Sequence, residues 1–202
     1  MIEAAAADLF ARHGFDGVSQ RQIAAAAGIR LGTLTYLYAD KVALYDRTVE
    51  AAIDYFGEAL LAAVNRPAPP LARLEGFITA MTRLHAERTV PGQIIAREMI
   101  EGESSRMAVL GRAMFRRLRA AVSPLLIDVS GRALSEDGAD RLTGQMINMT
   151  YAAVRSTRLY AGAFGAPPPR IEDQAAELRA LILFGIVPRP PEAPSSRTDI
   201  MP

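Results

Sequence analysis

Apolar residues recur along this chain at the spacing of one helical face. Such stripes run through residues 2–10, 44–60, 71–81, 107–125, 142–153 and 175–182. Steps of three or four residues place side chains on the same side of an α-helix. Alternating runs of β-branched residues, which are typical of strands, are absent from the sequence. The pattern therefore predicts an all-α protein.

Proline divides the predicted helices. None of the 13 prolines precedes Pro67, and most of them lie at 67–70, at 167–169 and from Pro188 onward. Because proline breaks a helix interior, the long helices are expected in the proline-free stretches. Residues 188–202 combine proline, serine and charge without an apolar face, which predicts a disordered tail.

Residues 19–38 carry the signals of two short helices joined by a tight turn. Ser19 and Gln22 fit a capping box, in which Ser19 caps the amide of residue 22 and Gln22 reaches back. Gly28 suits the left-handed position that ends a helix, and a second helix is expected over 31–38. With the longer helix predicted before them, they describe a helix-turn-helix, whose second helix enters the major groove of DNA.

A dense set of motif positions lies between residues 2 and 44. These are Ala5-Ala6-x-x-Leu9-Phe10, Gly14-Phe15, Ser19-x-Arg21-x-Ile23-Ala24-x-x-Ala27-Gly28-Ile29, Gly32-Thr33-Leu34 and Tyr38-x-x-Lys41-x-x-Leu44. In this register they resemble the DNA-binding domain of the TetR family of transcriptional regulators. Beyond them the resemblance is one of architecture, although Ala96-Arg97-Glu98-Met99 and Gly144-Gln145 are similar to one TetR subgroup.

The resemblance implies a domain organisation and a function. Residues 1–45 would form a three-helix helix-turn-helix DNA-binding domain, and residues 46–187 a helical effector-binding and dimerisation domain. The implied protein is a homodimer that represses by occupying a palindromic operator on double-stranded DNA and leaves it when a small-molecule effector binds. Helices over 135–161 and 171–186 are expected to pair with their twins as a four-helix bundle.

Carried over by position, ten residues form the predicted DNA-binding surface. The residues that open the first short helix toward the phosphates are Ser19, Gln20 and Arg21. The candidates for the groove-facing surface are Arg30, Leu31, Thr33, Thr35, Tyr36 and Leu37, and Lys41 matches the family's phosphate-contacting lysine. The sequence departs from the family at Arg30, usually Ser or Thr, at Thr35, often Tyr, and at Leu37, often aromatic or His.

Charge gives no direct sign of a nucleic-acid partner. The chain has a formal net charge of +1, and residues 1–47 carry five basic and five acidic side chains. A neutral DNA-binding unit would have weak nonspecific affinity, because phosphate contacts supply that affinity. Either the charges are segregated by face, or part of the amino terminus is missing from this chain.

The residue inventory argues against catalysis. There is no cysteine, only His13 and His85 are histidines, and no phosphate-cradling glycine loop or metal spacing is visible. We therefore predict no enzyme activity, no cofactor and no metal. The longest uncharged run, residues 142–154, is shorter than the roughly 18 residues of a membrane helix, and the first ten residues lack a basic signal region. A cytoplasmic protein without a membrane partner is expected.

Six methionines from Met81 to Met149 suit either an ordinary core or an adaptable apolar pocket. The candidate pocket residues are Phe77, Met81, Arg97, Met114, Met146, Met149 and Tyr151, and the expected effector is a small apolar or amphipathic molecule. Arg97 and Glu98 are more readily interpreted as an interhelical ion pair or a solvated face. The basic run Arg112, Arg116, Arg117 and Arg119 is interpreted as solvated, with contact to an acidic ligand or membrane as the alternative.

Two other functions stay open from the residues. One is a helical enzyme or small-molecule carrier in which the first 45 residues are merely structural, although no polar catalytic cluster supports it. The other is an adaptor that dimerises but has lost DNA binding, which the neutral amino-terminal unit keeps open.

Overall fold

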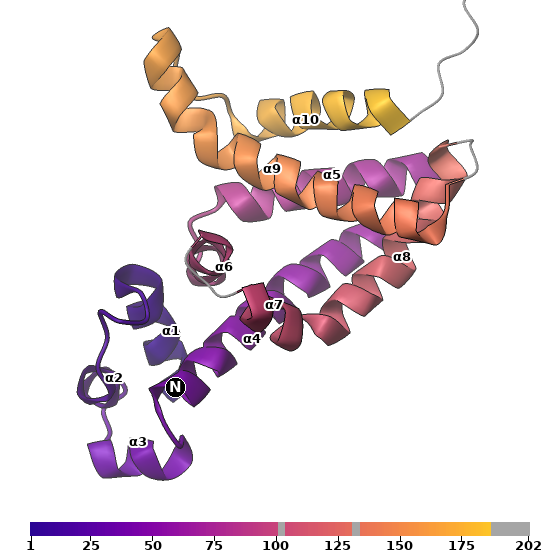
Figure 1. Ribbon diagram of the computed structural model, residues 1–202. Coiled ribbons are helices and arrows are strands. Elements are labelled where there is room, and N and C mark those ends of the chain that lie inside the picture. Colours follow the sequence, from indigo (N-terminus) through magenta and orange to yellow (C-terminus); the bar gives the residue numbers. More distant parts are fainter. Residues whose placement is uncertain (101–103, 131–133, 187–202) are drawn as a thin grey trace, which may run out of the picture.

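The computed structural model describes residues 1–100, 104–130 and 134–186, and every regular element in them is a helix, which confirms the all-α prediction (Figure 1). The predicted tail, 188–202, lies outside the described residues. The helices are α1 (Ile2–His13), α2 (Gln20–Ala26), α3 (Leu31–Leu37), α4 (Lys41–Val64), α5 (Pro70–Ala86), α6 (Val90–Ile100), α7 (Ser104–Leu110), α8 (Arg112–Ser130), α9 (Glu136–Phe164) and α10 (Ile171–Ile186).

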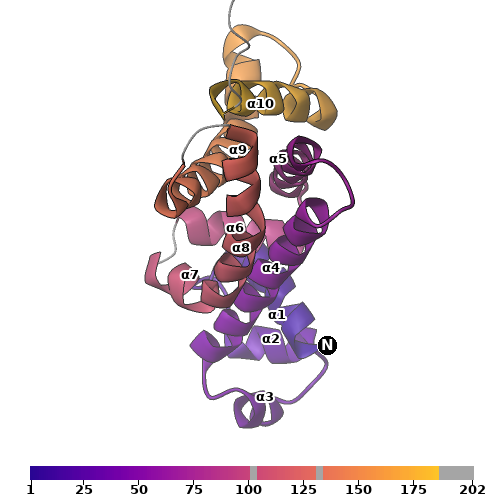
Figure 2. The ribbon, with the colours of Figure 1, turned by 90° about the vertical axis from the view of Figure 1, so that its right-hand side faces the viewer.

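Helices α1, α2 and α3 form a small unit at one end of the molecule, with α3 outermost and α10 at the opposite end (Figures 1 and 2). Phe10, Ile23 and Leu34 are fully buried inside this unit. The predicted capping box is present, since the amide of Gln22 donates to Ser19 Oγ at 3.3 Å and that of Ser19 to Gln22 Oε1 at 2.8 Å. Gly28 has a φ of 67°, which suits glycine and turns the chain from α2 into α3. The helix-turn-helix prediction is confirmed.

Helix α4 runs from this unit into the middle of the chain's other helices (Figure 2). Its 24 residues bury an apolar stripe that includes Leu44, Val49 and Ile53, against α5, α6 and α8. The domain boundary expected after residue 45 falls inside this continuous helix. A tilt of α4 would therefore move residues in both parts of the molecule.

The predicted stripe over 107–125 does not form one helix. The chain breaks at Gly111, and α7 and α8 lie on either side of it. In contrast, Pro124 lies inside α8, although proline normally ends a helix. Buried Val122, Leu125 and Leu126 flank it, so tertiary packing holds the helix together across the missing amide. Tertiary packing thus outweighs local propensity at Pro124.

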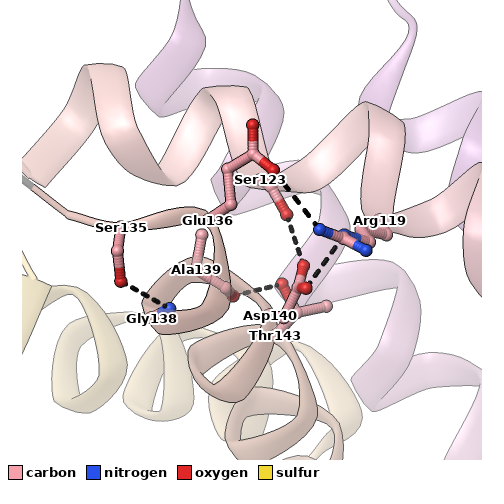
Figure 3. Close-up of polar contacts among 8 residues, drawn as sticks. All are labelled: Arg119, Ser123, Ser135, Glu136, Gly138, Ala139, Asp140 and Thr143. Atoms are coloured by element: carbon pink, nitrogen blue, oxygen red, sulfur yellow. Dashed lines mark hydrogen bonds and ion pairs between the residues drawn. The ribbon is translucent and has the colours of Figure 1, made fainter.

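The carboxyl-terminal helices form the far end of the fold. Helix α9 begins at the cap Ser135, whose Oγ accepts the amide of Gly138 at 3.1 Å, and ends at Gly165 with a φ of 66° (Figure 3). Helix α10 lies against α5, where Arg179 Nη1 donates to Thr79 Oγ1 at 3.0 Å. The last turns of α9 project beyond α10 in Figure 1. Within the described residues, no helix is both long and apolar enough to cross a membrane.

A buried carboxylate joins α4, α6 and α7. Glu98 is 5% exposed, and its Oε1 accepts the hydroxyl of Tyr45 at 2.7 Å and lies 3.7 Å from Arg106 Nη1. Burial, followed by this hydrogen bond, raises the pKa of Tyr45 above its usual value. Arg106 also pairs with Asp46 at 3.0 Å, so α7 is held to α4 and α6 by charge. The interhelical ion pair expected of Glu98 is present.

Tyr45→Phe should reveal how much this contact stabilises the fold. The substitution keeps the ring but removes a donor from a buried carboxylate, which costs about 1–3 kcal/mol of unfolding free energy. Urea unfolding measures the loss. Tyr55→Phe is the matched control, because Tyr55 is on the same helix and 45% exposed. Equal effects of the two substitutions would contradict a role for the Tyr45–Glu98 bond.

Candidate nucleic-acid interface and ligand cavity

The outward face of α3 is open to solvent. Tyr36 is 88% and Leu37 54% exposed, whereas Leu34 on the opposite face is fully buried. Thr33 is also exposed, and Thr35 Oγ1 bonds back to the carbonyls of Leu31 and Gly32 at 3.2 Å each. Leu31 is half-buried against the core. The predicted groove residues other than Leu31 thus share a free surface.

Three cations flank this face. Arg21 and Arg30 are exposed, and in the described part of the chain their side chains make neither an ion pair nor a hydrogen bond. Lys41, in the first turn of α4, donates to the carbonyl of Phe15 at 3.0 Å and lies 4.1 Å above that ring. An ammonium has three donors, so two remain available to a phosphate. Gln20 and the cap Ser19 open α2 near Arg21.

The other charges of the amino-terminal unit largely neutralise one another. Arg12 pairs with Asp8 at 3.0 Å, and Arg47 pairs with Glu3 at 3.5 Å and Glu50 at 2.6 Å. Asp46 pairs with Arg106, and the carboxylate of Asp40 caps α4 by accepting the amide of Ala43 at 2.7 Å. The basic face, defined as Arg21, Arg30 and Lys41, is therefore left with less opposing charge than the total suggests. Asp16 and Asp40 are the acidic residues of this unit that make no ion pair within the described residues, so segregation of the charges by face stays a prediction.

Arg97 connects this unit to the rest of the chain. From α6, its Nε donates to the carbonyl of Ala11 at 3.1 Å and its Nη2 to that of Arg12 at 3.0 Å. The last carbonyls of a helix lack partners within it, so Arg97 completes the end of α1. Gly14 follows with a φ of 74°, and a Cβ there would lie 3.2 Å from Arg97 Nη1. Glycine thus both ends α1 and leaves room for the guanidinium.

A cavity of about 710 Å³ lies between α4, α5, α6, α8 and α9. This volume is within the range of about 300–1,000 Å³ found for small-molecule sites. Gly57 lies where α4 approaches α8, and a Cβ there would collide with the side chain of Met114. The buried apolar residues of its lining are Ile53, Phe56, Leu60, Met81, Ile95, Met114 and Leu118.

His85 brings a polar group to this apolar lining. Its ring lies 5.9 Å from that of Phe56 and 5.5 Å from that of Tyr151, and Nδ1 is 3.5 Å from Thr150 Oγ1. Burial lowers the pKa of His85 to about 4. The imidazole is therefore neutral at pH 7 and offers the cavity an uncharged hydrogen-bonding group.

The seven predicted pocket residues do not all meet. Met81 and Met114 line the cavity, whereas Phe77 and Met146 are buried outside its lining and Met149 is 41% exposed. Tyr151 lines a smaller neighbouring pocket, and Arg97 contacts α1. Sequence reasoning missed the lining from α4 and α6, whose apolar spacing is that of an ordinary core. A glycine inside the large apolar stripe of α4 was the available signal of close helix approach.

Comparisons with known proteins agree with this geometry. Residues 2–48 match the family model of the bacterial regulatory proteins of the tetR family. No curated protein matches the chain by sequence.

Several solved structures share the fold. A fatty acid metabolism regulator of Clostridium perfringens is 20% identical, with a TM-score of 0.64 over 93% of this chain and 99% of that one. The ketosteroid regulator KstR2 of Mycobacterium tuberculosis is 21% identical, with a TM-score of 0.65 over 93% and 94%. AibR, solved with isovaleryl coenzyme A and operator DNA, is 19% identical, with a TM-score of 0.66 over 89% and 95%. Residues 2–48 thus form an amino-terminal domain of the tetR family, and the chain as a whole shares its fold with these solved regulators.

Proposed function

We propose that this protein is a ligand-responsive transcriptional repressor. As a homodimer it binds a palindromic operator in the cytoplasm, and a small apolar or amphipathic effector releases it. The observation that carries the proposal is the double contact of α6. Ile95 and Met99 line the cavity, whereas Arg97, on another face of the same helix, binds the end of α1.

This arrangement gives a route from cavity to DNA. A ligand between α4, α6 and α8 pushes on Ile95 and Met99, and α1 moves with α6 because Arg97 joins them. Two α3 helices of a dimer must fit half-sites about one helical turn apart, roughly 34–36 Å. The effector therefore needs only to bind the dimer conformation whose α3 helices are wrongly spaced for DNA more tightly than the conformation that fits. It then shifts the population of dimers away from the DNA-bound form.

The fold relatives support both halves of this proposal. AibR was solved with isovaleryl coenzyme A and operator DNA, and another structure of the same fold is a ketosteroid transcriptional regulator. The exposed face of α3 and the basic face supply the surface that DNA would contact.

The proposed dimer uses α9 and α10. Leu159, Phe164 and Leu181 are 69%, 80% and 62% exposed, which is unusual for large apolar side chains gathered on adjoining helices. Pairing with a twin as a four-helix bundle would bury them.

Substitutions in the DNA-binding surface should weaken operator binding. Arg21→Ala and Lys41→Ala should each remove one phosphate contact and lower the salt slope by about 1, whereas Tyr36→Ala should cost about 1–3 kcal/mol and relax specificity. Fluorescence anisotropy against promoter DNA at two salt concentrations measures both. Arg83→Ala, on exposed α5 surface, is the charge-matched control. Wild-type protein that binds no promoter DNA would favour the adaptor alternative instead.

Arg97→Ala should uncouple the two sites. A ligand found by thermal-shift screening of the dimer should still bind the variant, because Arg97 is outside the cavity lining. Its effect on DNA affinity, typically 5- to 150-fold in allosteric proteins, should shrink toward none. Titrations of DNA with and without the ligand give the ratio. An undiminished ratio in Arg97→Ala would show that the signal takes another route.

Charge placed on the proposed dimer face should produce monomers. Leu159→Glu with Phe164→Glu buries two carboxylates in an apolar interface, which disfavours association strongly. Light scattering at micromolar concentration reports the mass. Val109→Glu is the control, since Val109 is 61% exposed on α7. A wild-type monomer would contradict both the dimer and the operator model.

A further inference from the structure

The mouth of the cavity is basic although its interior is apolar. The buried apolar part of the lining comes from α4, α5, α6 and the inner face of α8, whereas Arg112, Arg116 and Arg119 reach the lining from exposed positions on α8. Charged side chains at the entrance of an apolar cavity have a cost unless they meet a partner there or in solvent. The partners of each arginine in this run therefore decide what the mouth can bind.

Two of the four arginines on this stretch of α8 are already engaged. Arg117 faces away from the cavity lining and pairs with Glu58 at 2.6 Å. Arg119 lies between Asp140 at 2.9 Å and Glu136 at 3.5 Å, as Figure 3 shows, and Asp140 also accepts the hydroxyl of Ser123 at 3.1 Å. These carboxylates hold Arg119 against the start of α9.

The mouth arginines, defined as Arg112 and Arg116, have no such partner. In the part of the chain that the structure describes, neither side chain makes an ion pair or a hydrogen bond. They are four residues apart on one helix and so lie on the same face, where like charges repel. Since Asp140 neutralises Arg119, the mouth keeps the positive charge of both residues.

We propose that the ligand of this cavity is an amphipathic anion, whose apolar chain fills the cavity and whose carboxylate or phosphate binds Arg112 and Arg116. The proposal rests on the proposed effector cavity and names the class of molecule that enters it. An anion relieves the repulsion between the two guanidiniums and accepts their hydrogen bonds, which are strong when both groups are charged. A neutral alcohol of the same chain gains only the apolar contacts, and a cation meets repulsion.

The full-length protein can be titrated by calorimetry with four ten-carbon probes below their micelle concentrations. These are decanoate, decanoyl coenzyme A, 1-decanol and decyltrimethylammonium. We expect at least one of the two anions to bind roughly tenfold or more tightly than decanol, equivalent to one or more charge-assisted hydrogen bonds. Binding of decanoate identifies a free carboxylate as sufficient. Binding of decanoyl coenzyme A alone identifies a phosphate-bearing carrier.

Substitutions on α8 test whether the preference for an anionic probe comes from the mouth arginines. Arg112→Gln with Arg116→Gln should abolish the advantage of the anion over decanol, and Arg112→Glu with Arg116→Glu should transfer the advantage to decyltrimethylammonium. Arg117→Gln is the matched control, because it removes the same charge from the same helix outside the lining. Circular dichroism checks that each variant is folded, which is expected because Arg112 and Arg116 are exposed without a partner among the described residues and Arg117 loses only an exposed ion pair with Glu58.

Three results would overturn the proposal. They are equal binding of decanol and the anions, equal loss in Arg117→Gln and the double variant, and binding of none of the four probes. Measuring the affinity for operator DNA in the presence of each probe tests the proposed ligand class separately from the proposed function as a regulator. An anion that binds without changing DNA affinity supports the ligand class and contradicts the regulator. Decanol that releases DNA as well as the anions do supports the regulator and contradicts the ligand class.

Discussion

Two carbonyl groups at the end of α1 help to fix how the amino-terminal unit sits on the rest of the chain. A helix cannot satisfy its own last carbonyls, and those of Ala11 and Arg12 are satisfied by Arg97 from α6. Gly14 makes the approach possible because it has no side chain in the path of the guanidinium. The carbonyl groups at the end of α1 thus receive their hydrogen bonds from α6, the helix that also lines the cavity. Together with the continuous helix α4, this contact joins the amino-terminal unit to the helices around the cavity.

The second constraint is that charged side chains on α6 and α8 need partners of opposite charge or contact with solvent. Glu98 is buried, yet Tyr45 and Arg106 hold it, so it anchors α6 and α7 to α4. On α8, Arg117 and Arg119 are neutralised by carboxylates on α4 and α9. Where charges have partners they fix helices relative to one another. Where they have none, as at Arg112 and Arg116, they are available to a ligand.

Local patterns predicted much of the fold but less of the cavity. The capping box at Ser19, the turn at Gly28 and the exposure of Tyr36 follow from residues within a few positions of each other, and the structure has all three. The stripe over 107–125 predicted a single helix, whereas the chain breaks at Gly111 and continues through Pro124. Methionine content suggested a pocket, and of the six methionines concerned Met81, Met99 and Met114 are in its lining. Apolar spacing is the same for a residue that faces a cavity and one that faces the core.

The sequence by itself determined the helical class, the helix-turn-helix and the family of the amino-terminal domain, because each depends on short-range periodicity, capping and turn chemistry. Only the tertiary structure decided which charges are neutralised and which remain free. The same charge type on neighbouring turns of α8 binds Glu58, binds Asp140 or meets no partner among the described residues, according to the helix that lies opposite. It also decided that Arg97 reaches α1, from a position 85 residues away in the chain. Contacts between distant segments depend on how helices pack in space. The spacing of residues along a single helix does not determine that packing.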